Sequence, residues 1–119
     1  MGGDLAATVS KLVQEVRHGR AALLMDVDGV PVEHVAPVAG AGLEEIAGEY
    51  ATLLRQARSV VAELNWGSPR SFSVRGAGRH VVFAFTPKDL LMGVEAGPAG
   101  LRGQMRYALG RALTQIGDL

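Results

Sequence analysis

The sequence predicts an α+β domain in which helices cover both faces of a five-stranded antiparallel sheet. Two observations lead to this class. Three segments carry apolar residues at steps of three and four, which is typical of helices, and five short apolar or alternating runs are bounded by turn residues, which is typical of strands. Along the chain the order is helix, two strands, long helix, three strands, helix. That order favours the long helix on one face of the sheet and the first and last helices on the other.

The composition indicates a domain with a sizeable core and no strong charge. The chain has 119 residues, of which 48% are hydrophobic and 20% charged, so we expect residues 1–119 to form a single domain. Twelve basic residues balance twelve acidic ones, and a nucleic-acid-binding surface is not expected. Cysteine is absent, which excludes disulfides and cysteine nucleophiles. No signal-like segment or membrane-length apolar run is present, so we expect a cytoplasmic protein without membrane insertion.

The first segment predicts an amphipathic helix over Asp4–Arg17. His18-Gly19 ends the apolar pattern, and the glycine suits a left-handed helix cap. The residues expected on the inner face are Leu5, Val9, Leu12, Val13 and Val16.

A β-hairpin is predicted next. Arg20–Val27 reads as a buried strand and Val30–Ala36 as its partner. Asp28-Gly29 lies between them and predicts a tight turn in which both residues adopt positive φ. Pro31 has no N–H to donate to a ladder, so the second strand is expected at an edge of the sheet.

Leu43–Leu64 predicts one helix of 22 residues, with Gly48 as its one weak position. Asn65–Pro69 ends it, and Trp66 is expected to cap the core there. The apolar arc is wide enough to face a sheet and, at its margin, a second copy of the chain. This arc comprises Leu43, Ile46, Tyr50, Leu53, Ala57, Val60 and Leu64, flanked by Ala47, Leu54 and Val61.

A three-stranded meander is predicted over Arg70–Arg75, Arg79–Thr86 and Asp89–Glu95. Placing the first strand beside the last gives the sheet order 2-1-5-4-3. The edge at Phe72–Arg75 carries neither proline nor lysine, so it is open to pairing with another chain. The final helix, Leu101–Ile116, is expected to face inward with Leu101, Met105, Ala108, Leu109, Ala112, Leu113 and Ile116.

Three stretches and the long helix resemble the Roadblock family, the dynein light-chain roadblock domain that also occurs in bacterial regulators of small Ras-like GTPases. The stretches are Ala22–Val32, Ser73–Phe85 and Leu90–Glu95. The resemblance implies a homodimer, or a heterodimer with a paralogue, in which the third strands pair and the long helices run antiparallel. It implies a non-enzymatic signalling module for a small Ras-like GTPase, either GTPase-activating or scaffolding. The alternative is a dynein-type or signalling adaptor without effect on nucleotide turnover.

Two sets of residues on these elements are candidates for protein binding. The margin of the long helix and the open strand are expected to form the dimer interface through Tyr50, Leu53, Ala57, Val60, Phe72 and Val74. The outward side of the helix carries several small residues that would let another backbone approach closely. A solvated face is the other interpretation of that side. The residues expected to bind the partner are Glu45, Gly48, Thr52, Arg55, Ser59 and Ala62.

One motif offers an enzymatic alternative. Asp26-Val27-Asp28 after a strand looks like the motif of haloacid-dehalogenase-type phosphatases, with Asp26 as nucleophile and Asp28 as proton donor. The hairpin turn is the favoured interpretation, because another strand follows directly. His18, His34 and His80 show no metal-ligand spacing and are expected at the surface or at an edge. No catalytic residue, metal or cofactor is therefore expected.

Overall fold

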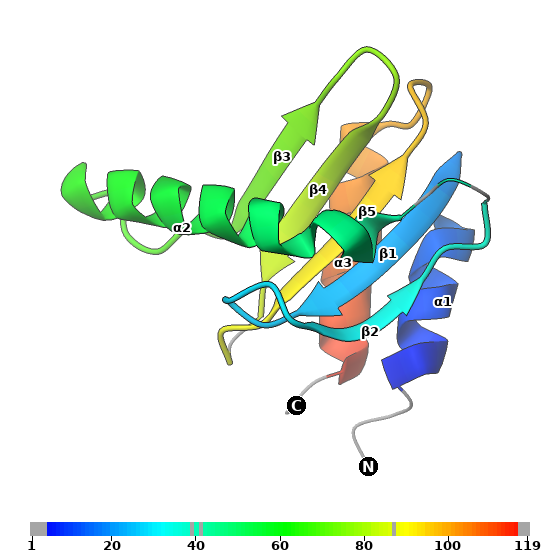
Figure 1. Ribbon diagram of the computed structural model, residues 1–119, viewed down its shortest axis with the longest axis horizontal. Helices are drawn as coiled ribbons and strands as arrows, with labels where there is room; N and C mark the ends of the chain where they lie inside the picture. The colour runs from blue at the N-terminus through cyan, green and yellow to red at the C-terminus, as the bar shows by residue number, and fades with distance from the viewer. Residues whose placement is uncertain (1–4, 39, 41, 87, 117–119) are drawn as a thin grey trace.

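The computed structural model describes residues 5–38, 40, 42–86 and 88–116, and it shows one sheet with helices on both faces (Figure 1). All strand pairings are antiparallel, and the order β2-β1-β5-β4-β3 confirms the predicted order. Each strand begins and ends within two residues of its predicted bounds. The strands are β1 (Gly19–Met25), β2 (Pro31–Val35), β3 (Ser71–Arg75), β4 (His80–Phe85) and β5 (Leu91–Ala96).

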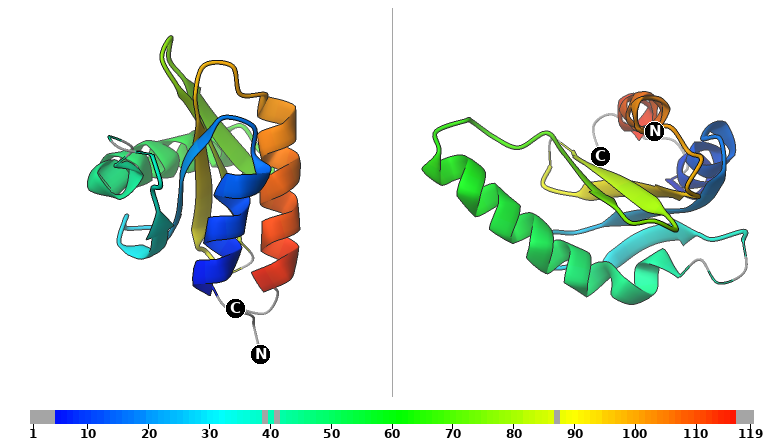
Figure 2. Two further views of the ribbon diagram at one scale, coloured as in Figure 1. Left: turned by 90° about the vertical axis from the view of Figure 1, so that its right-hand side faces the viewer. Right: turned by 90° about the horizontal axis from the view of Figure 1, so that it is seen from above.

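Helices α1 (Leu5–Glu15) and α3 (Arg102–Ile116) lie on one face of the sheet, and α2 (Ala47–Glu63) crosses the other (Figure 2). This arrangement was predicted. Asp4, the predicted first residue of α1, lies outside the described residues. Leu101 was predicted to face inward, but it precedes α3 and is exposed, because the helix begins one residue later.

Each face of the sheet has its own apolar core, because side chains of a strand alternate between the two faces. The core under α1 and α3 contains Val9, Leu12, Val82, Met92, Val94, Met105 and Leu109. The core under α2 contains Ala21, Leu23, Met25, Leu43, Ala47, Ala51, Leu54, Val81, Phe83 and Leu91.

The junction between α1 and β1 corrects the predicted cap. His18, with φ of 62°, takes the left-handed conformation in place of Gly19. Gly19 is required for a different reason, since a Cβ there would lie 2.4 Å from the carbonyl oxygen of Val13. The side chain of Gln104 in α3 closes the helix end by donating to the carbonyl of Glu15 at 2.8 Å and accepting from the N–H of Arg17 at 2.9 Å.

The β1–β2 turn is longer than the two-residue turn that was predicted. The N–H of Asp26 donates to the carbonyl of Val30 at 3.1 Å, and that of Gly29 donates to the carbonyl of Asp26 at 3.0 Å. Within this turn Gly29 has a positive φ, of 87°, whereas Asp28 does not. Three-residue hairpin loops commonly end on such a left-handed glycine.

The long helix begins with a short 3-10 segment, Leu43–Ile46, before the α-helix Ala47–Glu63, so a continuous α-helix of 22 residues was wrong. It packs on the sheet through Leu43, Ala47, Ala51 and Leu54, all buried. Two of these are alanines, which let the helix axis come close to the strands. Leu53 and Val60, which belong to the predicted arc, therefore lie on the flank of the helix and are exposed.

The far end of α2 is closed by backbone hydrogen bonds. Asn65, with φ of 58°, donates to the carbonyl of Ala62 at 3.1 Å, and Trp66 donates to that of Val61 at 3.1 Å. This is a Schellman arrangement with asparagine in the left-handed position. The end projects past β3 (Figure 1), and Trp66 is 72% exposed, so its predicted role as a cap on the core was wrong. There is no sheet beneath it to cover.

His80 was expected at the surface or an edge, yet it is 3% exposed on β4. A Cβ on Gly100 would lie 2.9 Å from Nε2 of His80. That nitrogen has no hydrogen-bond partner within the described part of the chain. Burial lowers the pKa of His80 from its ordinary value, and the charges of Arg75 and Arg102 lower it further. The backbone of Gly100 only partly offsets this.

Acid is therefore expected to destabilise the fold through His80. Because its pKa is lower in the folded chain than in the unfolded one, the unfolded chain binds the extra proton first. The contribution of His80 is complete above the unfolded value of 6.5 and is lost as the pH falls below it. Urea unfolding at about pH 7.5 and about pH 5.5 should show a smaller loss of stability in His80→Gln than in the parent chain. Substitution of the exposed His34 by Gln is the control; an equal effect from both would contradict the assignment.

Candidate functional site

Helix α2 carries a row of exposed apolar side chains along one flank. We call Ile46, Leu53, Val60 and Leu64 the α2 stripe. Leu53 is 40% exposed and Val60 is 52% exposed. Tyr50 and Ala57 lie half-buried between the stripe and the sheet, and the Tyr50 ring packs 5.1 Å from that of Phe83. A continuous apolar row of this kind typically marks a surface that binds protein.

The stripe lies beside the edge strand β3. β3 pairs with β4 on one side only, so the backbone groups on its other side form an open edge of the sheet. Phe72 and Val74 are half-buried and pack against the core under α2, on the same face of the sheet as Tyr50. The fold thus brings the residues predicted for a dimer interface to one side of the molecule, where α2 crosses β3.

The residues predicted to bind a partner are all exposed. They do not form one outward patch, because Arg55 turns toward the β1–β2 loop. Its guanidinium donates to the carbonyl oxygen of Val27, lies 3.4 Å from the Thr52 hydroxyl and lies 3.9 Å from a carboxylate oxygen of Asp28. We call Glu45, Gly48, Thr52, Arg55, Ser59 and Ala62 the outer face. It extends from the solvent side of α2 to the flank opposite the stripe.

Gly48 leaves an open space on the outer face. A Cβ built at Gly48 meets no described atom within 4 Å outside its own helix backbone. The close contact at this point belongs to Gly29, where a Cβ would lie 2.8 Å from the Cα of Gly48. The turn therefore requires a glycine at position 29 and not at position 48. A glycine that weakens a helix without a steric reason inside the chain favours an external role.

A hollow of about 350 Å³ lies on the same face of the sheet as α2, lined by both apolar and charged residues. Ile46, Tyr50 and Val74 form apolar walls. Glu95 is buried at its edge, with one carboxylate oxygen 3.1 Å from Arg79 and 3.7 Å from Arg20. Sequence reasoning missed this cluster, although a glutamate in the internal strand β5 beside an arginine in β1 was a usable signal.

Tyr50 faces this charged cluster. Burial raises the pKa of its hydroxyl, the charge of Glu95 adds to the rise, and that of Arg79 opposes it. The hydroxyl is therefore protonated at neutral pH and available as a hydrogen-bond donor at the wall of the hollow.

The Asp26 carboxylate is part of the turn. Its Oδ1 accepts hydrogen bonds from the N–H groups of Asp28 at 2.9 Å and Val30 at 3.0 Å, which is the hairpin interpretation of the motif. Across the described residues, no three His, Asp or Glu side chains lie close enough together to hold a metal ion. None of the described helices is long and apolar enough to span a bilayer.

The fold is that of the profilin-like α+β domains, here with an exposed apolar row beside an open strand edge. The chain belongs to the Roadblock/LC7 domain family, which matches residues 5–96. The predicted family resemblance is confirmed.

Solved structures support the same fold. A Roadblock/LC7 domain from Streptomyces avermitilis superposes with a TM-score of 0.84 at 20% identity, over 96% of this chain and 95% of that one. MglB from Myxococcus xanthus gives 0.83 at 12% identity, over 94% and 90%. An MglB described as having a tetrameric arrangement gives 0.84 at 15% identity, over 94% and 84%. No curated protein sequence matches the chain.

Proposed function

We propose that this protein is a dimeric, non-enzymatic module that binds and regulates a small Ras-like GTPase. The observation that carries the proposal is the position of two unpartnered features on one side of the molecule. Helix α2, which carries the α2 stripe, crosses the sheet and projects past β3, whose outer edge is open (Figure 1). Each is a feature that proteins normally cover.

A second copy related by a two-fold axis at the β3 edge covers both features together. Pairing of β3 with its equivalent satisfies the open backbone groups and joins the two sheets. The same rotation brings the two α2 helices side by side and antiparallel, stripe against stripe. The MglB structure described as tetrameric supports self-association in a similar fold.

The joined α2 helices then present the two outer faces as a platform for the GTPase. The bacterial regulators that the sequence resembles support this class of partner. The platform changes nucleotide turnover only through different affinities for the GDP-bound and GTP-bound partner. The test measures binding of the purified chain to bacterial small Ras-like GTPases loaded with GDP or a GTP analogue, together with their nucleotide turnover. Binding that prefers one nucleotide state supports regulation, binding without preference indicates a scaffold, and no binding to either form contradicts the proposal.

Gly48 provides a matched test of the outer face. Substitution by Arg fills the open space above α2 and is expected to weaken GTPase binding by at least about tenfold, which is the cost of about 1.4 kcal/mol of lost contact. Gly103 is the control, since it is the second residue of α3, as Gly48 is of α2, and a Cβ there also meets nothing within 4 Å. Gly103→Arg should leave binding unchanged. Equal affinities for the two variants, measured by calorimetry, would place the GTPase elsewhere.

A further inference from the structure

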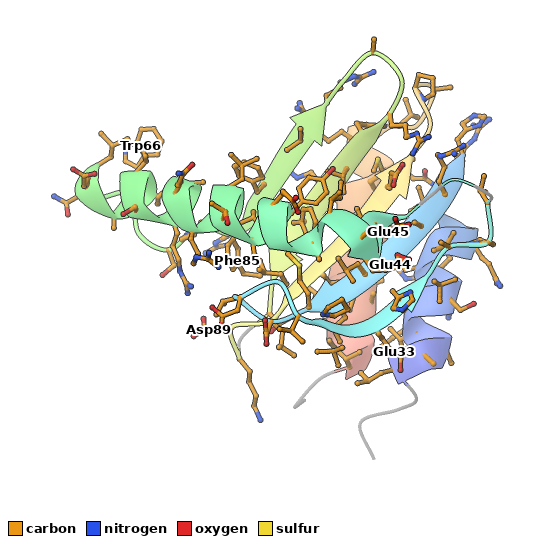
Figure 3. All side chains as sticks on the ribbon, in the orientation of Figure 1. Glu33, Glu44, Glu45, Trp66, Phe85 and Asp89 are labelled. Carbon is orange, nitrogen blue, oxygen red and sulfur yellow. The ribbon has the colours of Figure 1, made fainter. Side chains whose placement is uncertain are left out.

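Trp66, the largest exposed aromatic side chain among the described residues, follows directly on the end of α2. The three backbone hydrogen bonds that close α2 involve Leu64, Asn65 and Trp66, so the position of the Trp66 backbone is determined by the helix end. Its indole nevertheless projects into solvent beyond the sheet, at the far end of α2 (Figure 3). Covering this indole with another surface would gain free energy, because it removes apolar area from water.

The hollow at the other end of α2 has the dimensions and chemistry to receive it. Its volume is about 350 Å³. A cavity of about 150 Å³ already holds a benzene ring, so one indole fits. Ile46, Tyr50 and Val74 provide apolar walls. The carboxylates of Glu45 and Glu95 can accept a hydrogen bond from the indole N–H, which needs a partner when it is buried.

The hollow and Trp66 cannot meet within one chain. They are separated by the length of α2, since twenty residues of helix span about 30 Å. They lie, however, at opposite ends of the α2 stripe. Ile46 is the first member of the α2 stripe and lines the hollow, whereas Leu64 is its last member and immediately precedes the Trp66 end.

An antiparallel second copy brings the two together. The midpoint of the stripe lies near residue 55, so stripe-to-stripe contact places the Trp66 end of one helix level with Ile46 of the other. Because α2 projects past β3 (Figure 1), that end would lie over the sheet of the second copy. This step depends on the dimer given above as part of the proposed function.

We infer that Trp66 of each copy inserts into the hollow beside Tyr50 and Glu95 of a second copy. The interface therefore contains two equal aromatic anchors, one at each end of the paired helices. The hollow is incomplete without the partner. Buried tryptophans are among the residues that contribute most to the free energy of association.

The chain contains one Trp, so its fluorescence reports this contact directly. Sedimentation and acrylamide quenching are measured on the full chain across the same range of concentration. As dimer replaces monomer, the emission should move to shorter wavelength and the quenching constant should fall several-fold. A dimer whose Trp66 is quenched as strongly as that of the monomer would overturn this inference and leave the dimer standing. A chain that stays monomeric at every concentration would overturn both.

Substitutions test the anchor independently of fluorescence. Trp66→Ala should raise the dimer dissociation constant by about 30-fold or more, the effect expected for an interface hot spot. Tyr107→Ala is the matched control, because Tyr107 is an aromatic residue 69% exposed on α3, away from the stripe. Equal dissociation constants for the two variants would overturn the inference.

A variant of the hollow keeps the test valid if Trp66→Ala folds poorly. Ile46 is 45% exposed and lies at the start of α2, where a carboxylate suits the helix dipole. Ile46→Glu should therefore keep the fold and retain the indole, while placing a charge in the hollow. At concentrations where sedimentation shows the variant itself to be dimeric, it should show red-shifted, readily quenched emission. Emission as protected as that of the parent would overturn the inference.

Discussion

Replacing Gly93 by Ala is expected to lower the free energy of unfolding by about 3 kcal/mol, the upper part of the usual range for overpacking a core. Gly93 lies opposite Phe83 in the β4–β5 ladder, and the Phe83 ring lies over it. A Cβ at Gly93 would be 2.4 Å from Cε1 of that ring. The ring cannot move aside freely, because it is fully buried and packs against Tyr50. Thermal and urea unfolding would measure the loss.

Gly78→Ala is the matched control for this substitution. Gly78 lies in the β3–β4 turn, and a Cβ there meets nothing within 4 Å. The same change of residue should therefore alter stability by less than about 0.5 kcal/mol. A Gly93→Ala protein as stable as Gly78→Ala would mean that the core under α2 is looser than the close contact with Phe83 indicates.

Replacing Val60 by Asp is expected to raise the dimer dissociation constant by about 100-fold or more, since it buries an unpaired carboxylate in the proposed interface. In a single copy Val60 is 52% exposed, so the substitution should leave the fold of the monomer intact. Sedimentation at several concentrations would measure the dissociation, and circular dichroism would report the fold. Leu53→Asp should behave in the same way, because Leu53 belongs to the same stripe.

The control for Val60→Asp is Ala62→Asp. Both positions lie in the last turns of α2 and both are exposed. A carboxylate near the end of a helix is unfavourable at either one. Only Val60, however, belongs to the α2 stripe. If both variants dissociate equally, the effect comes from the helix and not from the interface, and if both remain dimeric, the stripe is not the interface.

Topology and layering were predictable from the sequence because they depend on patterns repeated over many residues. The turn residues of the hairpin and the meander predicted which strands pair in sequence, and Pro31 predicted β2 at an edge. Placing β1 beside β5 then completed the strand order. The open edge of β3 was predictable for the same reason. The two candidate surfaces were predicted from that edge and from the long helix. Arg55 departs from the predicted outward patch, because it turns toward the β1–β2 loop.

The exact rotation of α2 was not predictable. Helical periodicity identifies an apolar arc but does not determine which part of a wide arc faces the sheet. The small residues Ala47 and Ala51 pack on the sheet, where they allow close approach, and Leu53 and Val60 lie exposed on the flank of the helix. The predicted burial of Trp66 and the predicted exposure of His80 were wrong for a related reason. The exposure of Trp66 depends on where α2 ends relative to β3, and that of His80 depends on how the chain after β5 covers β4. Neither arrangement can be read from the local sequence pattern.

The projection of α2 past β3 also affects how the stability of this protein should be understood. From Ser59 to Trp66, only the side chain of Val61 is even half-buried, so these turns gain little from packing in a lone chain. Helical segments of this length are marginal in water unless something packs against them. A lone chain should therefore fray at this end, and the encounter with a second chain would complete its folding. Its melting temperature would then rise with concentration, so that folding and assembly form a single equilibrium.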